Sequence, residues 1–172
     1  FTNKAARELR ERCEVLVPGS RDCLQVRTFH GFCAKILRVD GGRIGVDTAY
    51  LIYDQDDQLR IVRRVLEEMD VDTRRFTPRS VLSVISSAKN RGLDEGMFAR
   101  DVLDRRYHEN FSAYFHEIAA RTYTRYGELL AASKALDFDD LLLRTVRLLE
   151  SKPDVLDRYQ DNYRYLLIDE FQ

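Results

Sequence analysis

The amino-acid sequence predicts a mostly α-helical protein in which fragments of an α/β core, one at each end, flank a large all-helical insertion. Three observations predict this arrangement. Residues 1–40 follow a helix–strand–helix order, which is typical of α/β proteins. From Asp54 onward, apolar residues recur at the three- and four-residue spacing of amphipathic helices. Near the end, the apolar run Tyr165–Ile168 predicts a buried strand, and the acidic pair Asp169 and Glu170 follows it.

The first segment is expected to begin with a helix. Thr2 or Asn3 can cap this helix, because short polar side chains accept hydrogen bonds from the exposed backbone amides of a first turn. The helix is expected to run to about Glu14, where a Pro-Gly-Ser sequence soon follows. Its inner side is expected to carry the apolar residues Ala5, Ala6 and Leu9.

Two short elements complete this segment. Leu24–Thr28 alternates in polarity and predicts a strand. Phe29–Val39 carries apolar residues along one helical face, so we expect a helix with Phe29 in the core. A glycine-rich loop after Asp40 then separates this segment from the insertion.

The insertion and the return from it are expected to be helical. Thr77 and Pro78 are suited to the cap and first turn of one helix, and Gly92 to its end. The helices are expected at about 54–69, 78–91, 111–135 and 138–150, with a short one starting at Pro153. This organisation divides the chain into residues 1–40, 41–136 and 137–172, with the first and last sharing one parallel sheet.

Composition excludes several classes of function. The 172 residues include 28 Lys and Arg against 29 Asp and Glu, so binding of nucleic acid must depend on local placement of charge. No apolar stretch approaches the roughly 18 residues of a membrane span, so we expect a cytoplasmic protein without a membrane partner. The cysteines Cys13, Cys23 and Cys33 are odd in number and form no CxxC pair, which argues against a disulfide or metal framework.

The acidic pair at the end suits nucleotide chemistry. An apolar strand that ends in two carboxylates can place them in the crevice where nucleotides bind. Asp169 could hold Mg²⁺, and Glu170 could orient or deprotonate an attacking water. The same pattern also occurs by chance at strand ends, so it leaves a purely structural interpretation open.

Four blocks in order resemble superfamily 1 DNA helicases of the UvrD/Rep type. Asp169-Glu170-Phe171-Gln172 resembles their Walker B motif. Motif Ia is resembled by Phe1-Thr2-Asn3-Lys4-Ala5-Ala6, at the start of the chain. Motif Ib is resembled by Thr28-Phe29-His30-Gly31. The segment that returns from the helical insertion of these helicases is resembled by Asp137-Phe138-Asp139-Asp140-Leu141-Leu142.

The resemblance implies a partial P-loop NTPase core of the RecA-like type, with residues 41–136 as the insertion called subdomain 1B. It implies ATP and Mg²⁺ as cofactors, Asp169 as the Mg²⁺ organiser and Glu170 as the residue that activates water. Gln172 would then sense the γ-phosphate or link it to the DNA site. The implied activity is ATP-driven 3′→5′ translocation on single-stranded DNA and unwinding of duplexes, in DNA repair or replication.

The resemblance also implies the DNA contacts. Phe1 would stack on a base, and polar groups at the helix starts would bind phosphate. These groups are Thr2, Asn3, Thr28 and His30. The expected partners are single-stranded DNA and single-strand/duplex junctions. In the insertion, a weak basic face toward DNA is expected from Arg74, Arg75, Arg79, Lys89 and Arg91.

The pattern is incomplete, and alternatives stay open. No GxxxxGK[ST] loop is present, so we expect an internal fragment, from motif Ia to motif II, without ATPase activity of its own. An unpaired strand edge also offers a route to a homodimer of this fragment. The alternatives are the helicase part of a RecB/AddA-type helicase–nuclease, a non-catalytic helical interaction module, and a double-strand nucleic-acid clamp without ATPase function.

Overall fold

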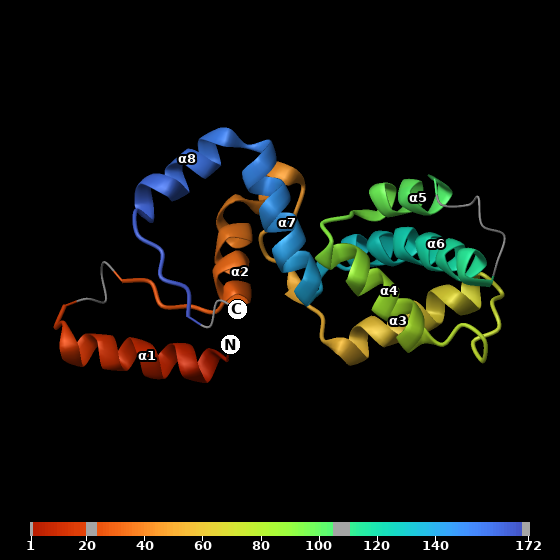
Figure 1. Ribbon diagram of the computed structural model, residues 1–172, viewed down its shortest axis with the longest axis horizontal. Coiled ribbons are helices and arrows are strands. Elements are labelled where there is room, and N and C mark those ends of the chain that lie inside the picture. The colour runs from red at the N-terminus through yellow and green to blue at the C-terminus, as the bar shows by residue number, and fades with distance from the viewer. Residues whose placement is uncertain (1, 20–23, 105–110, 170–172) are drawn as a thin grey trace.

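The computed structural model describes residues 2–19, 24–104 and 111–169. The molecule is elongated, with a helical bundle at one end and the remaining helices at the other (Figure 1). Within the described residues, no helix is both long and apolar enough to cross a membrane.

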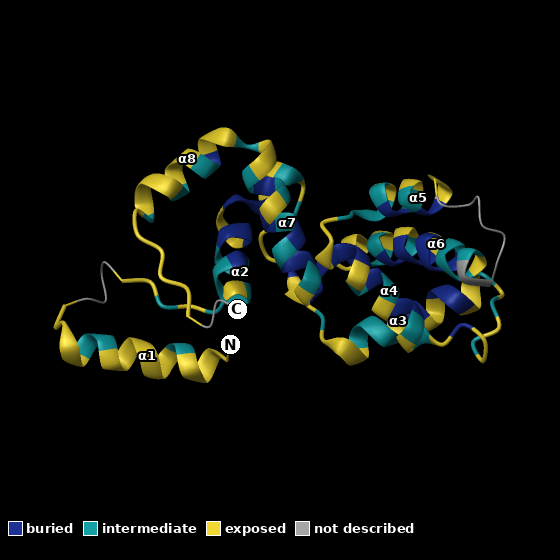
Figure 2. Cartoon of the chain, viewed as in Figure 1, coloured by how far each residue is buried: buried dark blue, intermediate teal, exposed yellow. Residues whose placement is uncertain are grey.

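The first helix, α1 (Asn3–Leu16), lies along one side of the molecule. Thr2 caps it, as the sequence predicts: the Thr2 Oγ1 accepts a hydrogen bond from the Ala5 amide at 3.1 Å. The predicted inner side is wrong, because no residue of α1 is buried and Leu9 is 45% exposed. Figure 2 shows this helix almost entirely exposed. No residue of α1 therefore belongs to either buried core of the described chain.

The central part of the molecule packs α2 (Phe29–Asp40) and the 3-10 turn η2 (Gly41–Ile44) against α7 (Phe138–Ser151) and α8 (Pro153–Asn162). Thr28 caps α2, and Pro153 occupies the first turn of α8, where its missing amide costs nothing. We call the buried cluster between these elements the α2–α7 core. Its residues are Cys33, Ile36, Leu37, Tyr50, Leu136, Leu141, Leu148 and Val155.

The helical bundle contains α3 (Gln55–Glu68), α4 (Pro78–Asn90), α5 (Glu95–Asp104) and α6 (Phe111–Ala132). Asp54 and Thr77 cap α3 and α4 with their side chains, and Gly92 adopts the left-handed conformation (φ 77°) that ends α4. Figure 2 shows the buried residues facing inward between these helices. The bundle core includes Val62, Leu66, Phe76, Val81, Ile85, Phe98, Ile118, Tyr123, Tyr126 and Leu130.

Two short strands connect the bundle to the central part. β1 (Leu51–Ile52) and β2 (Ala135–Leu136) pair in parallel, with Leu51 opposite Ala135. Because the chain enters the bundle just after β1 and leaves it at β2, this pairing holds the entry and exit side by side. Ala135 belongs to the bundle core and Leu136 to the α2–α7 core. The change from one core to the other therefore occurs within this strand.

Both predicted strands of the end segments are wrong for the described residues. Leu24–Thr28 has no regular secondary structure, and Tyr165–Ile168 is exposed rather than buried, with Leu167 98% exposed. The expected parallel sheet shared by the two ends is therefore not formed by the described residues. A strand needs backbone partners on a neighbouring strand, and the described residues beside these segments supply none.

Candidate nucleic-acid interface

The N-terminal ends of α1 and α2 lie together. The Thr28 hydroxyl donates a hydrogen bond to Asn3 Oδ1 at 3.4 Å, and it accepts one from the Gly31 amide at 3.1 Å. A second link joins the same segments, since the Arg10 guanidinium donates to the Val26 carbonyl oxygen at 2.8 Å. Three residues of the predicted DNA site, Thr2, Asn3 and Thr28, are thus brought to adjoining helix starts. Helix starts present backbone amides and a positive dipole end, which suit a phosphate.

An aromatic pair flanks these helix starts. The ring of His30, in the first turn of α2, contacts the ring of Phe138 at the start of α7, with centroids 5.7 Å apart and planes at 73°. Phe138 is 47% exposed, so part of this pair faces solvent. We call His30 and Phe138 the aromatic platform.

The sequence did not identify Phe138 as a site residue, and it placed Phe29 wrongly. Phe138 lies in the block that resembles the return from the helical insertion, and that block was given no binding role. Phe29 was expected in the core, but it is 60% exposed. The residues of α2 that do pack inward are Cys33, Ile36 and Leu37. The exposure of an aromatic residue in the first turn of a helix depends on which other elements pack against that turn. Helical periodicity in the sequence does not show these elements.

The platform depends on how α7 begins. Asp137 caps this helix: its Oδ1 accepts a hydrogen bond from the Asp140 amide at 2.8 Å, and Asp140 Oδ2 accepts one from the Asp137 amide at 3.4 Å. This reciprocal arrangement is a capping box, which fixes the direction in which the chain enters the helix. Phe138 is the first residue of that helix, so its position follows from the cap.

The expected basic face in the insertion is only partly present. Lys89 is buried at 4% exposure and cannot contribute to a surface. Arg74 pairs with Asp72 at 3.3 Å, and Arg91 pairs with Asp101 at 3.4 Å, so part of their charge is neutralised. Arg79 instead lines an open pocket of about 650 Å³ between the starts of α3 and α4. The other lining residues are Asp56, Leu59, Arg60, Arg63, Thr77 and Pro78.

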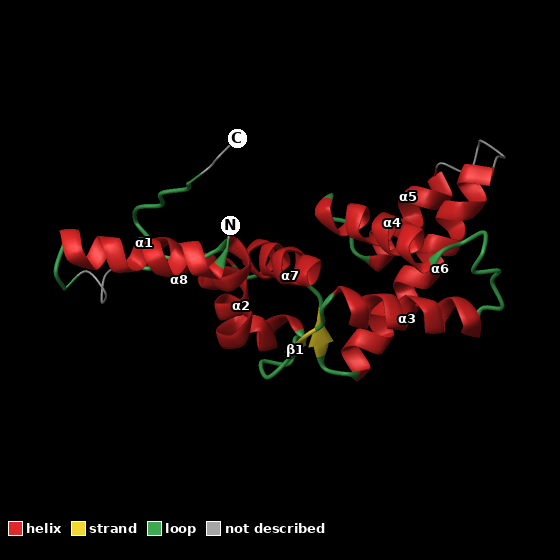
Figure 3. Ribbon diagram, turned by 90° about the horizontal axis from the view of Figure 1, so that it is seen from below, coloured by secondary structure: helices red, strands yellow, loops and turns green. Residues whose placement is uncertain are grey.

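The expected ATP-site residues lie at or beyond the end of the described chain. Asp169 is exposed, whereas Phe1, Glu170 and Gln172 lie outside the described residues. The segment after α8 runs back toward the starts of α1 and α2 in Figure 1, and Figure 3 shows it displaced from both. In the ranges 2–19, 24–104 and 111–169, no three His, Cys, Asp or Glu residues are grouped to hold a metal ion.

Comparisons with known proteins cover the whole chain. The family described as the UvrD/REP helicase N-terminal domain matches residues 1–172. The chain is 37% identical over 172 residues to the ATP-dependent DNA helicase PcrA of Bacillus subtilis (strain 168) and 36% identical to PcrA of Staphylococcus aureus (strain Mu50). It is 41% identical over 174 residues to PcrA of Leuconostoc citreum. Each match covers 100% of this chain and 22% of the relative, so the chain spans about a fifth of their length.

Proposed function

This chain belongs to the UvrD/REP helicase family, and we propose that it is the part of an ATP-dependent DNA helicase that extends from motif Ia to the acidic Walker B motif. The relatives that match all of it carry the name ATP-dependent DNA helicase. In this proposal, residues 1–40 and 137–172 belong to a RecA-like motor domain, and residues 41–136 form its helical insertion. The whole protein moves 3′→5′ on single-stranded DNA and unwinds duplexes in repair or replication.

The observation that carries the DNA-binding role is the meeting of two helix starts beside an exposed aromatic pair. Thr28 contacts Asn3 where α1 and α2 begin, and the aromatic platform lies at the same end of α2. Phosphate groups of the strand would be bound by the helix starts, and a base would stack on the exposed part of the Phe138 ring. Since every base has a π-face, this arrangement suits a motor that must move over any sequence.

The nucleotide chemistry rests on the acidic end. We assign Asp169 to organising Mg²⁺, Glu170 to activating the attacking water, and Gln172 to sensing the γ-phosphate. Phosphoryl transfer needs a phosphate cradle as well as these groups, and no GxxxxGK[ST] loop is present in the sequence. The 172-residue chain alone should therefore show no ATPase activity. Mg²⁺-dependent turnover by the purified chain that disappears in Glu170→Gln would contradict this.

The DNA-binding role can be tested in the intact protein with Phe138→Ala. Loss of one base–aromatic stack costs about 1–3 kcal/mol, or roughly 5- to 150-fold in affinity. Oligo-dT and oligo-dA should be affected alike, because stacking tolerates any base. The readout is fluorescence anisotropy of a labelled oligonucleotide.

A matched control is Val146→Ala, since Val146 lies on the same helix with similar exposure, 51% against 47% for Phe138. We expect this control to bind DNA like the parent. If Phe138→Ala also binds both oligonucleotides with parental affinity, the aromatic platform is not a DNA contact.

A further inference from the structure

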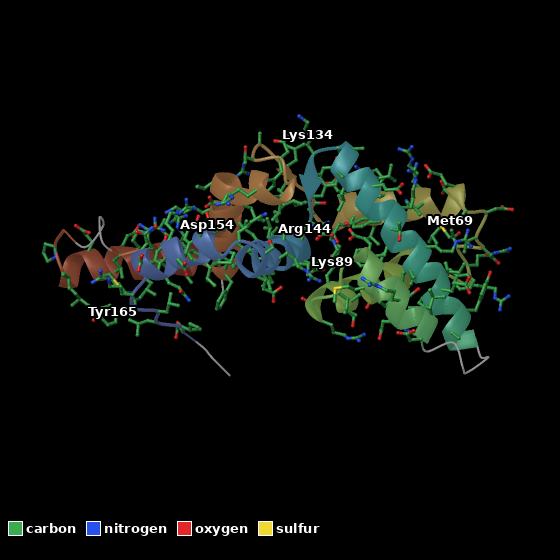
Figure 4. All side chains as sticks on the ribbon, turned by 90° about the horizontal axis from the view of Figure 1, so that it is seen from above. Met69, Lys89, Lys134, Arg144, Asp154 and Tyr165 are labelled. Carbon is green, nitrogen blue, oxygen red and sulfur yellow. The ribbon has the colours of Figure 1, made fainter. Side chains whose placement is uncertain are left out.

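A buried lysine joins the helical bundle to the start of α7. Lys89, on α4, has a side chain that is 1% exposed, and its Nζ lies 2.6 Å from Asp137 Oδ2 and 2.9 Å from Asp140 Oδ1. Figure 4 shows Lys89 where α4 meets α7. Both carboxylates belong to the capping box of α7, so this one ammonium group holds both members of the cap.

Two tyrosines of α6 complete the surroundings of this lysine. The Tyr126 hydroxyl donates a hydrogen bond to Asp137 Oδ2 at 2.8 Å, and the Lys89 Nζ lies 5.2 Å from the Tyr126 ring and 5.6 Å from the Tyr123 ring. We call Lys89, Asp137, Asp140 and Tyr126 the Lys89 cluster. It combines groups from α4, α6 and α7.

Lys89 keeps its charge despite burial. Burial lowers the pKa of Lys89, but the nearby carboxylates of Asp140 and Asp137 raise it further, and the net shift is upward. The pKa of Asp140 is raised, first by burial and also by the charge of Asp137, while Lys89 opposes the rise. Lys89 therefore stays protonated at neutral pH, and its removal would leave two buried carboxyl groups without a cation.

Stability alone does not explain such a cluster. Apolar residues of similar volume often stabilise a protein as well as a buried ion pair does, or better. Unlike apolar packing, a charge cluster forms hydrogen bonds of defined geometry, which fix the relative orientation of the groups that it joins. Here the group so directed is the first turn of α7, whose first residue is Phe138 of the aromatic platform.

We propose that Lys89 is a positioning residue for nucleic-acid binding: it ties the helical bundle to the start of α7 and thereby orients Phe138 toward the DNA strand. This inference rests on the proposed function. The Lys89 side chain is too deeply buried to contact a phosphate, so it acts through Phe138.

The test uses the intact protein with oligo-dT as the probe. Lys89→Met alone leaves two buried carboxyl groups unpaired and can unfold the protein. The informative variant is therefore the triple substitution Lys89→Met, Asp137→Asn, Asp140→Asn, since asparagine caps helices as well as aspartate does. We expect this variant to fold, as judged by circular dichroism and urea unfolding, and to bind oligo-dT about 5-fold or more weakly, the lower end of the loss caused by removing one base stack.

A double-mutant cycle distinguishes positioning from general weakening. If the Lys89 cluster acts through Phe138, the triple substitution should cause little further loss of affinity in a Phe138→Ala background. Its dependence on salt should equal that of the parent, because no phosphate contact is removed. Ser86→Ala is the matched control: it breaks the other hydrogen bond between α4 and α7, from Ser86 Oγ to Asp139 Oδ2 at 2.6 Å, without touching the cap. We expect it to bind DNA like the parent.

The possible failures are distinct. If Phe138→Ala itself binds oligo-dT like the parent, the proposed DNA contact is wrong. If Phe138→Ala weakens binding but the triple variant does not, or if their effects multiply independently, only the positioning role is overturned. A reduced salt dependence in the triple variant would mean that Lys89 acts on phosphate, which also overturns it.

Discussion

Replacing Tyr126 with phenylalanine removes one hydroxyl from the Lys89 cluster and leaves the ring in place. Tyr126 is 0% exposed, and its hydroxyl donates to Asp137 Oδ2 at 2.8 Å. Hydrogen bonds to charged groups contribute about 1.5–3 kcal/mol, because a buried carboxylate loses a donor that water cannot replace. We therefore expect Tyr126→Phe to lower the free energy of unfolding by about 1.5–3 kcal/mol.

The same helix provides a matched control, Tyr123→Phe. Tyr123 is also 0% exposed, but its hydroxyl donates to the neutral carbonyl oxygen of Leu93, at 3.1 Å. Such a bond contributes about 0.5–1.5 kcal/mol. Both variants keep the aromatic face that Lys89 approaches, so the contact between the cation and the ring largely cancels in the comparison.

Urea unfolding followed by circular dichroism measures both variants of the 172-residue chain. The comparison holds if the slope of the unfolding free energy against urea concentration is the same for parent and variants. Differences between the midpoint urea concentrations of unfolding then report stability alone. A Tyr126→Phe variant that loses no more stability than Tyr123→Phe would refute the reasoning that Asp137 is a charged acceptor that needs this hydroxyl.

Three further predictions concern the bundle core, the exposed segment after α8 and the surface charges. Leu66→Ala should cost about 2–5 kcal/mol of unfolding free energy, because Leu66 is 0% exposed in the bundle core. Leu167→Ala, at a position that is 98% exposed, should change it by less than about 0.5 kcal/mol in the same urea assay. Hydrogen bonds from Arg125 and Arg64 lower the pKa of Glu68 below its ordinary value of 4.5, so Glu68 stabilises the fold above that pH and loses this effect as pH falls. The unfolding free energies of the parent and Glu68→Gln should therefore converge between about pH 6 and pH 3, and a gap that stays constant would contradict this.

The helix starts could be predicted from the sequence because their causes are local. Thr2 and Thr77 accept hydrogen bonds from amides three residues ahead, at Ala5 and Ser80, and Pro153 suits a first turn. These interactions involve neighbours in the chain, so residue type and spacing suffice to identify them. The candidate DNA contacts at the starts of α1 and α2 came instead from the resemblance to motifs Ia and Ib.

The strands and the full platform could not be predicted in this way. Leu24–Thr28 has the alternation of a strand, but a strand exists only where a second strand supplies its hydrogen bonds. Phe138 joins His30 from a helix that begins more than a hundred residues later, and no local pattern encodes that contact.

Lys89 shows the same division most clearly. The sequence by itself determined that Lys89 lies on a helix and that Asp137 begins another. A lysine near other basic residues predicts an exposed basic face, since a charge normally stays in water. Only the tertiary structure brought α4 against α7, where two carboxylates and a tyrosine hydroxyl replace the water that the ammonium group loses. The physical reason is that helix formation depends on neighbours in the chain, whereas the burial of a charge depends on partners that packing brings from distant segments.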